Sequence, residues 1–202
     1  MTDWGRQMLY QVRRWVPERS IVLVSDSSFA AFEFLSALAQ MPNPVHVVTR
    51  LRLDTERYDP PPVRRPKQMG RPRKVGRRLP ALKALVNTPY TPWQSVTMTD
   101  WYSRGDYGLQ ITSATALWYK TGMPAVPIRW VLIRDPKGNF ETQVLLYTNL
   151  SATPEQILYW FRQRWQLEVI FEEVQAYLGV ETQCQGSSLA IARTTPVFLG
   201  LF

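Results

Sequence analysis

Ile21-Val22-Leu23-Val24-Ser25-Asp26-Ser27-Ser28 is the stretch of sequence that decides the fold. Its first four residues are all apolar and three of them are β-branched, which favours a strand buried on both faces, as in a parallel sheet. The polar residues that follow end the strand. Ligands of parallel α/β sheets bind at the carboxyl ends of the strands, so we expect Asp26 to lie at such an edge.

The flanking residues extend this strand into an α/β unit. Residues 28–40 are rich in Phe, Ala and Leu and predict a helix, and Val45 to Val48 predict a second buried strand. A strand, a helix and a strand in this order predict a βαβ unit. Upstream, residues 3–15 predict a short amphipathic helix. Its apolar residues share one face: Trp4, Met8, Val12 and Trp15.

A Pro-rich, basic segment at 60–79 interrupts this pattern and predicts an extended, mobile excursion. Eight of the 24 Lys and Arg residues lie here, with no acidic residue between them, and the remaining 16 equal the 16 acidic residues in number. The net charge of +8 therefore comes from one segment, which indicates a polyanionic partner. The basic residues are Arg64, Arg65, Lys67, Arg71, Arg73, Lys74, Arg77 and Arg78.

The second half of the chain predicts strands and then a long helix. Residues 95–98, 108–119, 126–133 and 142–147 have strand patterns. Thr153-Pro154-Glu155-Gln156 is a strong helix start with a capping box, and the helix should run to about Leu178 and stop at Gly179. We expect its core stripe to be Leu167, Ile170, Phe171, Val174 and Leu178.

The scarcity of Cys and His restricts the possible metal sites. Cys184 is the single Cys, which excludes an internal disulfide and a Cys-rich zinc site, and His46 is the single His. A metal would have to be held by carboxylates, which favours Mg²⁺ or Mn²⁺. No apolar run approaches the ~20 residues of a membrane span, so we expect a cytoplasmic protein that associates with the nucleoid and not with a membrane.

Each candidate site residue also has an ordinary structural interpretation. Asp26 is at a position that equally suits a helix N-cap, and its local sequence alone favours the cap. Glu168 lies on one helix face with Phe161, Arg164 and Gln175, where an Arg164–Glu168 pair four residues apart is an ordinary exposed contact. The basic segment contains Gly70-Arg71-Pro72-Arg73-Lys74, similar to a minor-groove AT-hook core, but it could also be a solvated linker.

Taken together, these pieces resemble insertion-sequence DDE transposases with an RNase H-like DDE superfamily endonuclease domain. The stretch from Val22 to Phe29 is similar to the strand and turn that carry the second catalytic Asp of that family, and Phe161 to Glu168 is similar to its Tyr-x-x-Arg-x-x-x-Glu helix. The likeness covers nearly the whole chain. Further similar stretches are Val48 to Leu53, Gly70 to Lys74, Pro127 to Asp135 and Gly179 to Phe202.

Three departures from the family pattern affect this interpretation. Phe161 replaces the Tyr of the motif, and Gln175 replaces a Lys seven positions after the Glu. The first catalytic Asp has no counterpart, because Asp3 is the single Asp before Asp26 and lies at a helix start. The chain therefore looks like a C-terminal part that lacks a central strand, and loss of that strand would leave the edge of the 21–24 strand open.

The resemblance implies metal-dependent transposition of DNA. Asp26 and Glu168 would be catalytic metal ligands for Mg²⁺ or Mn²⁺. Arg164 would position a phosphate, and Trp165 would stack on a displaced base. The basic segment would bind DNA. We expect the fragment to be inactive alone, and its partners to be transposon ends, target DNA and a second copy or a full-length transposase. The alternatives are a non-catalytic DNA-binding remnant or competitor, a stand-alone nuclease, and a fragment without selected function.

The predicted organisation is a single, interrupted domain. Residues 1–202 would form a partial RNase H-like catalytic domain of the α/β class, interrupted by an insertion at 51–125. The insertion would contain the basic arm, 60–79, and a β-rich part, 93–120.

Overall fold

A computed structural model describes residues 2–64, 69–99, 101, 105–178, 187, 189–190 and 192–193. The chain divides into two compact units, Met1–Phe161 and Arg162–Phe202. The α/β class is confirmed, since four α-helices accompany one mixed sheet in the described chain. None of the described helices combines the length and apolar character that crossing a bilayer requires.

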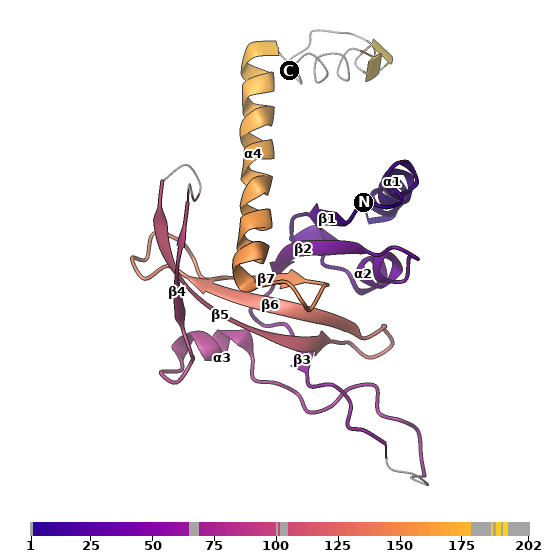
Figure 1. Ribbon diagram of the computed structural model, residues 1–202, viewed down its shortest axis with the longest axis vertical. Helices are drawn as coiled ribbons and strands as arrows, with labels where there is room; N and C mark the ends of the chain where they lie inside the picture. Colours follow the sequence, from indigo (N-terminus) through magenta and orange to yellow (C-terminus); the bar gives the residue numbers. More distant parts are fainter. Residues whose placement is uncertain are drawn as a thin grey trace. The chain divides into compact units, whose positions relative to one another are not determined.

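The first unit is built on a seven-stranded sheet of order β1-β2-β7-β6-β5-β3, with β4 also paired to β5 (Figure 1). β1 and β2 are parallel, and all other pairs are antiparallel. The strands are β1 Ile21–Val24, β2 Val45–Leu51, β3 Arg57–Tyr58, β4 Gln94–Met98, β5 Tyr107–Trp118, β6 Val126–Arg134 and β7 Gln143–Tyr147. The helices are α1 Thr2–Trp15, α2 Phe32–Ala39, α3 Leu82–Asn87, α4 Pro154–Leu178 and the short 3₁₀ helix η1 Ser27–Phe29.

The predicted βαβ unit is present, with one correction. The helix expected at 28–40 is divided into η1 and α2, because the chain between them is extended at Ala31 (φ −124°, ψ 132°). This break lets Phe29 and Phe34 pack against each other, with ring centroids 5.4 Å apart. Two elements in the Pro-rich part of the chain, β3 and α3, were not predicted at all.

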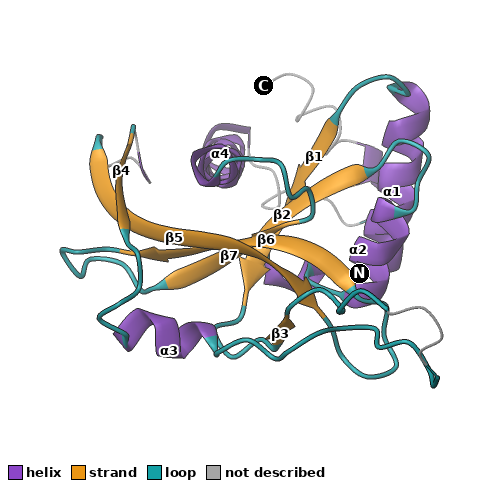
Figure 2. Cartoon of the chain, turned by 60° about the horizontal axis from the view of Figure 1, so that its bottom comes forward, coloured by secondary structure: helices purple, strands orange, loops and turns teal. Residues whose placement is uncertain are grey.

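Each face of the sheet has its own hydrophobic core. Leu35 and Leu38 of α2, Leu82 of α3 and Leu9 of α1 cover one face, and Figure 2 shows α2 and α3 on that side. The opposite face is covered by the start of α4, through Ile157, Leu158 and Phe161. Apolar alternation along the strands supplies both cores, because successive side chains point to opposite faces.

The sequence predicted the start of α4 correctly, but it did not predict which residues of the helix are buried. Thr153 and Gln156 form the capping box, with reciprocal backbone-to-side-chain hydrogen bonds of 3.0 and 3.3 Å. The predicted core stripe is wrong for three of its five members, since Leu167, Ile170 and Phe171 are 52%, 39% and 49% exposed. Val174 is buried. The contacts that anchor the helix to the sheet come instead from its first two turns. The side chain of Leu178 and the expected stop at Gly179 lie outside the described residues.

Three of the four residues on the predicted apolar face of α1 are exposed. Trp4, Met8 and Trp15 are 74%, 67% and 70% exposed, whereas Leu9 and Arg13 are buried. Arg13 is buried because its guanidinium donates hydrogen bonds to backbone carbonyls, including Arg19 at 2.6 Å and Pro44 at 3.1 Å. Periodicity therefore predicted the helix correctly but did not identify its buried face.

The β1 strand is at the end of the sheet, and the expectation that a neighbouring strand is missing stays a prediction. It pairs with β2 along one side, and no other described segment pairs with its outer side. All four of its residues are half-buried, although the sequence favoured a fully buried strand. The division of the chain into a catalytic domain interrupted at 51–125 stays a prediction, and β3, β4 and β5 from that segment extend the same sheet.

Candidate functional site

Asp26 lies where two parallel strands end at a common edge of the sheet. Val24 of β1 pairs with Val48 of β2, and the Ser25 N–H continues this ladder by donating to the Val48 carbonyl at 3.0 Å. The Thr49 hydroxyl then donates to the carbonyl of Asp26, so the backbone of Asp26 is tied to β2. The position expected for a carboxylate at the carboxyl edge of a parallel pair is therefore correct.

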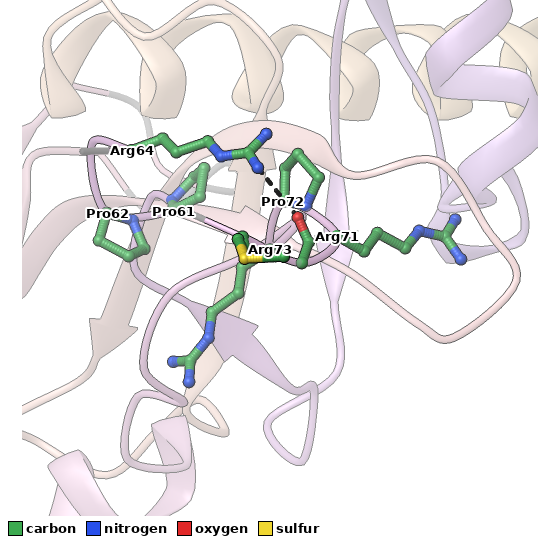
Figure 3. Close-up of a pocket in the computed structure, with 8 residues that line it drawn as sticks. Pro61, Pro62, Arg64, Arg71, Pro72 and Arg73 are labelled. Carbon is green, nitrogen blue, oxygen red and sulfur yellow. Dashed lines mark hydrogen bonds between the residues drawn. The ribbon is translucent and has the colours of Figure 1, made fainter. Parts of the chain in front are cut away.

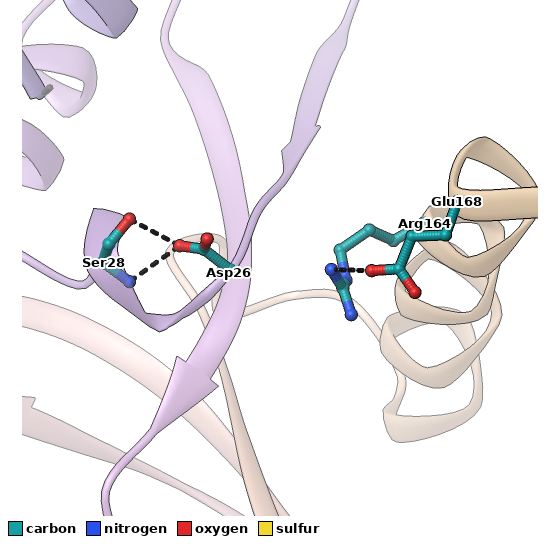
Figure 4. A network of polar contacts seen from close by, with 4 residues as sticks. All are labelled: Asp26, Ser28, Arg164 and Glu168. Carbon is teal, nitrogen blue, oxygen red and sulfur yellow. Dashed lines mark hydrogen bonds and ion pairs between the residues drawn. The ribbon is translucent and has the colours of Figure 1, made fainter. Parts of the chain in front are cut away.

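The side chain of Asp26 also caps η1. One carboxylate oxygen, Oδ1, accepts hydrogen bonds from the Ser28 N–H at 2.8 Å and from the Ser28 hydroxyl at 2.5 Å (Figure 4). Asp26 is therefore the N-cap of η1, as its local sequence favoured. This role does not exclude metal binding, since an ionised carboxylate has about four lone-pair positions and the Asp26 side chain is exposed.

Glu168 belongs to the second unit and is paired with Arg164. Arg164 Nη1 donates to Glu168 Oε1 at 2.5 Å, and the two side chains are 23% and 39% exposed (Figure 4). This is the pair, four residues apart, that the sequence allowed as an ordinary contact. Trp165 beside it is half-buried. Asp26 belongs to the first unit, and a common metal for Asp26 and Glu168 stays a prediction.

The two departures in the α4 motif have different environments. Phe161 is 2% exposed and belongs to the core beneath α4. A side chain that is buried among apolar groups gains from losing a hydroxyl unless that hydroxyl has a partner, so Phe suits the position. Gln175 is exposed.

The basic arm, which we define as residues 60–79, is attached to the sheet by a paired root. The backbone N–H groups of Asp59, Gly76 and Leu79 donate to the carbonyls of Arg77, Asp59 and Arg57 at 2.8, 2.8 and 2.7 Å. The root allows no side chain at Gly76, since a Cβ there would lie 2.4 Å from the Pro60 carbonyl oxygen. The arm is therefore an excursion, as predicted, but its two ends are held together.

Two of the arm's cations are neutralised at this root. Arg78 pairs with Glu56 at 2.7 Å, and Arg77 pairs with Asp59 at 3.4 Å. The arm contains no acidic residue of its own, but the residues on either side of β3 supply these two carboxylates. Arg77 and Arg78 therefore contribute less positive potential than the sequence implied.

The described cations of the arm's tip remain exposed. Arg64 donates to the Gly70 carbonyl at 3.0 Å and closes a hollow of about 380 Å³ (Figure 3). The hollow is lined by Pro61, Pro62, Arg64, Met69, Gly70, Arg71, Pro72 and Arg73. A second hollow of about 470 Å³ brings Arg71, Arg73 and Lys74 to Tyr119 and Gly122 of the β5–β6 connection. Arg65 and Lys67 lie outside the described residues.

The model of one protein family matches this chain, and its description is DDE superfamily endonuclease. The match covers residues 1–124, more than half of the chain. The chain belongs to this family. No curated protein shows a significant match to the sequence.

The range of the family match includes some, but not all, of the candidate site residues of this DDE superfamily endonuclease. The matched range contains Asp26, the basic arm and the strands β1 to β5, whereas Glu168 lies beyond it. Endonuclease domains of this superfamily act on DNA and generally use divalent metal ions. A carboxylate at the edge where β1 and β2 end and a cluster of exposed cations in the arm agree with these two properties.

The candidate metal ligands of this DDE superfamily endonuclease are carboxylates, which suit a hard cation, but the described residues do not bring three of them together. Carboxylate oxygens such as those of Asp26 and Glu168 are the ligands that Mg²⁺ and Mn²⁺ prefer. In the described ranges, however, no group of three or more His, Cys, Asp or Glu side chains lies close enough to hold a metal. His46 is half-buried on β2, with Nε2 3.4 Å from Asn149 Nδ2, and is not part of such a group.

Sequence reasoning missed three residues that the fold of this DDE superfamily endonuclease places near the candidate site and the arm. Glu56 and Asp59 pair with arm cations, and Arg50 of β2 extends from the strand beside Asp26. The sequence contained one sign of Arg50, a lone cation within the otherwise uncharged stretch Val47 to Leu51. A charge inside a buried strand is costly unless it points out at an edge or a site.

Proposed function

We propose that this chain acts in DNA transposition, by metal-dependent cleavage of DNA strands and transfer of the freed ends into target DNA. The observation that carries the proposal is the family match over residues 1–124 together with the placement of Asp26 at the edge where β1 and β2 end. The positive potential of the arm supports DNA as the substrate, since polyanion binding is governed by clustered Lys and Arg.

The proposal gives each candidate residue a role. Asp26 and Glu168 would hold the divalent cation, and Ser28 fixes the carboxylate of Asp26 in one orientation. The cation, when bound, withdraws charge from the attacked phosphate and favours ionisation of the attacking hydroxyl. Arg164 would hold a phosphate oxygen, Trp165 would stack on a displaced base, and the arm would follow the DNA backbone.

The proposal includes a partner. Two carboxylates make a weaker site than the three of a complete DDE set, so this chain should bind the cation weakly and cleave no DNA by itself. The proposed partners are a second copy of the chain and a full-length transposase, of which only the transposase would bring a third carboxylate, and the complex would be located at the nucleoid.

The test measures metal binding and cleavage on the same preparations. We expect wild-type protein to bind Mn²⁺ weakly in an electron paramagnetic resonance titration, and Asp26→Asn to abolish that binding. We also expect no nicking of DNA that carries matching element ends, with Mg²⁺ or with Mn²⁺. Mn²⁺ binding that survives Asp26→Asn would contradict the assignment of Asp26. Robust cleavage lost in Asp26→Ala would favour a stand-alone nuclease instead.

A second candidate function is a non-catalytic DNA-binding remnant that competes with a full-length transposase. It is favoured by the incomplete donor set of the described residues. Removing residues 64–78 would also remove the paired root, so the discriminating variant is one that keeps the root and changes the tip. We call it the arm-neutral variant: Arg64→Gln, Arg71→Gln, Arg73→Gln and Lys74→Gln combined.

The arm-neutral variant separates the two functions. A binding remnant should lose most of its DNA affinity in this variant and show no Mn²⁺ binding in the wild type. A transposase chain should show both properties, DNA binding through the arm and Mn²⁺ binding through Asp26. The matched control is Arg77→Gln with Arg78→Gln, which removes cations that are already paired with acidic side chains.

A further inference from the structure

Arg50 lies on the same face of the sheet as Asp26 and at the same edge. On β1 and β2, Val24 and Val48 are paired and both pack against the core beneath α4. Arg50 is two residues beyond Val48 within β2, so the alternation of a strand returns its side chain to that face. Asp26 is two residues beyond Val24, its backbone is extended (φ −76°, ψ 178°) and Thr49 holds it beside β2.

The guanidinium of Arg50 is held in place by an aromatic ring. Its Cζ lies 5.5 Å from the centroid of Phe161, which is itself 2% exposed. This distance is within the range of a cation–π contact. Its backbone is also fixed, because Arg50 pairs with Leu145 of β7 in the interior of the sheet. The side chain therefore loses little further freedom when it binds an anion.

The charge of Arg50 is not neutralised by its surroundings. The side chain is exposed, and no carboxylate of a described residue forms an ion pair with it. Arg52, two residues further on, is the opposite case, since it is fully paired with Asp54 through two hydrogen bonds of 2.9 and 2.7 Å. A planar guanidinium that contacts an aromatic ring through a cation–π interaction still has N–H donors for an anion, which suits a phosphate.

We propose that Arg50 is a positioning residue that binds a DNA phosphate at the Asp26 edge, with Phe161 as its stacking platform. The inference rests on the proposed function, because it assigns a phosphate contact to the same sheet edge. It also explains why Phe161 can stand in place of Tyr: the position supplies a buried ring rather than a hydroxyl. The contact is separate from the basic arm and does not depend on a bound metal.

The test is the salt dependence of DNA binding, measured by fluorescence anisotropy with a labelled duplex in the absence of divalent metal. We expect Arg50→Gln to weaken binding about tenfold. It should also reduce the slope of log affinity against log salt by about 0.9, the value for one lost phosphate contact. Arg50→Lys should keep the wild-type slope and lose only part of the affinity, since Lys retains the charge but not the planar donors.

Arg52→Gln is the matched control, and it should change affinity less than twofold. If Arg50→Gln has the same affinity and slope as Arg52→Gln, the inference is overturned. Failure of the proposed function has a different signature, since Mn²⁺ binding would then be absent from the wild type or would survive Asp26→Asn, whatever Arg50→Gln does to DNA affinity. Unchanged thermal unfolding of Arg50→Gln establishes that its effect is local.

Discussion

The Asp26 carboxylate accepts two hydrogen bonds from one residue, Ser28: one from the backbone N–H at 2.8 Å and one from the hydroxyl at 2.5 Å. The cap and the candidate metal ligand are therefore the same group. An Asp that serves only as an N-cap can be replaced by Asn, because Asn is an equally good N-cap. An Asp whose negative charge is needed to bind a metal cannot be replaced by the neutral Asn. This difference separates the two roles by experiment.

Asp26→Asn should leave stability within about 0.5 kcal/mol of the wild type, because the side-chain oxygen of Asn still accepts from Ser28. Asp26→Ala should cost about 1 kcal/mol through loss of the cap. In the absence of divalent metal, both variants should bind DNA more tightly, since a negative charge at the proposed DNA-binding edge is removed. Urea unfolding and anisotropy measure the two effects. Equal loss of stability in both variants would contradict this account of the cap.

Glu168→Gln should be nearly neutral for stability and harmful for metal binding. The Arg164–Glu168 pair is partly exposed and four residues apart on a helix, so its loss should cost less than about 0.5 kcal/mol. Mn²⁺ affinity should nevertheless fall, because the variant loses a proposed charged ligand. Glu172→Gln is the matched control on the same helix and should retain wild-type affinity. Identical Mn²⁺ titrations for the two variants would remove Glu168 from the site.

Arg57→Ala should destabilise the protein by about 2–4 kcal/mol, and Arg52→Ala should not. Arg57 is 1% exposed, stacks 4.5 Å from the Trp130 ring and donates to the Pro80 carbonyl at 2.7 Å. Burial lowers the pKa of its guanidinium to about 10, so the group stays charged at neutral pH.

Hydrogen exchange should report where the effect of Arg57→Ala is located. The amides of Asp59, Gly76 and Leu79 form the root of the arm, and they should lose protection first. A loss of stability below about 1 kcal/mol, or protection that is unchanged at these three amides, would show that Arg57 does not hold the root.

His46 should make stability depend on pH below neutrality. Burial, and secondarily the charge of Arg13, lowers the pKa of His46 below its usual value of 6.5. Below pH 6.5 the unfolded chain therefore takes up a proton that the folded chain does not, and stability falls as the pH falls through this window. His46→Gln should remove that part of the pH dependence in urea titrations between about pH 7 and pH 5. An unchanged pH profile would exclude His46 as its source.

Local sequence signals determined most of the elements near the candidate site. The β-branched run at Ile21 to Val24, the second run at Val45 and the capping box at Thr153 each act within a few residues, so they could be read without the fold. The position of Asp26 at the carboxyl edge followed from the same signals, because a βαβ unit places both strand ends on one side. The break at Ala31 was missed, since it serves the packing of Phe29 on Phe34 rather than any local preference.

Tertiary structure alone decided which groups meet. The pairing of Arg78 with Glu56, the contact of Arg57 with Trp130 and the cation–π contact of Arg50 with Phe161 all join segments that the sequence separates. The same holds for the buried faces of α1 and α4, because periodicity identifies an apolar stripe but not the surface that covers it. The sequence by itself thus determined strands, helix starts and the candidate carboxylates, through interactions between near neighbours. The folded chain decided burial, charge neutralisation and the environment of Asp26, because these depend on contacts between residues far apart along the chain.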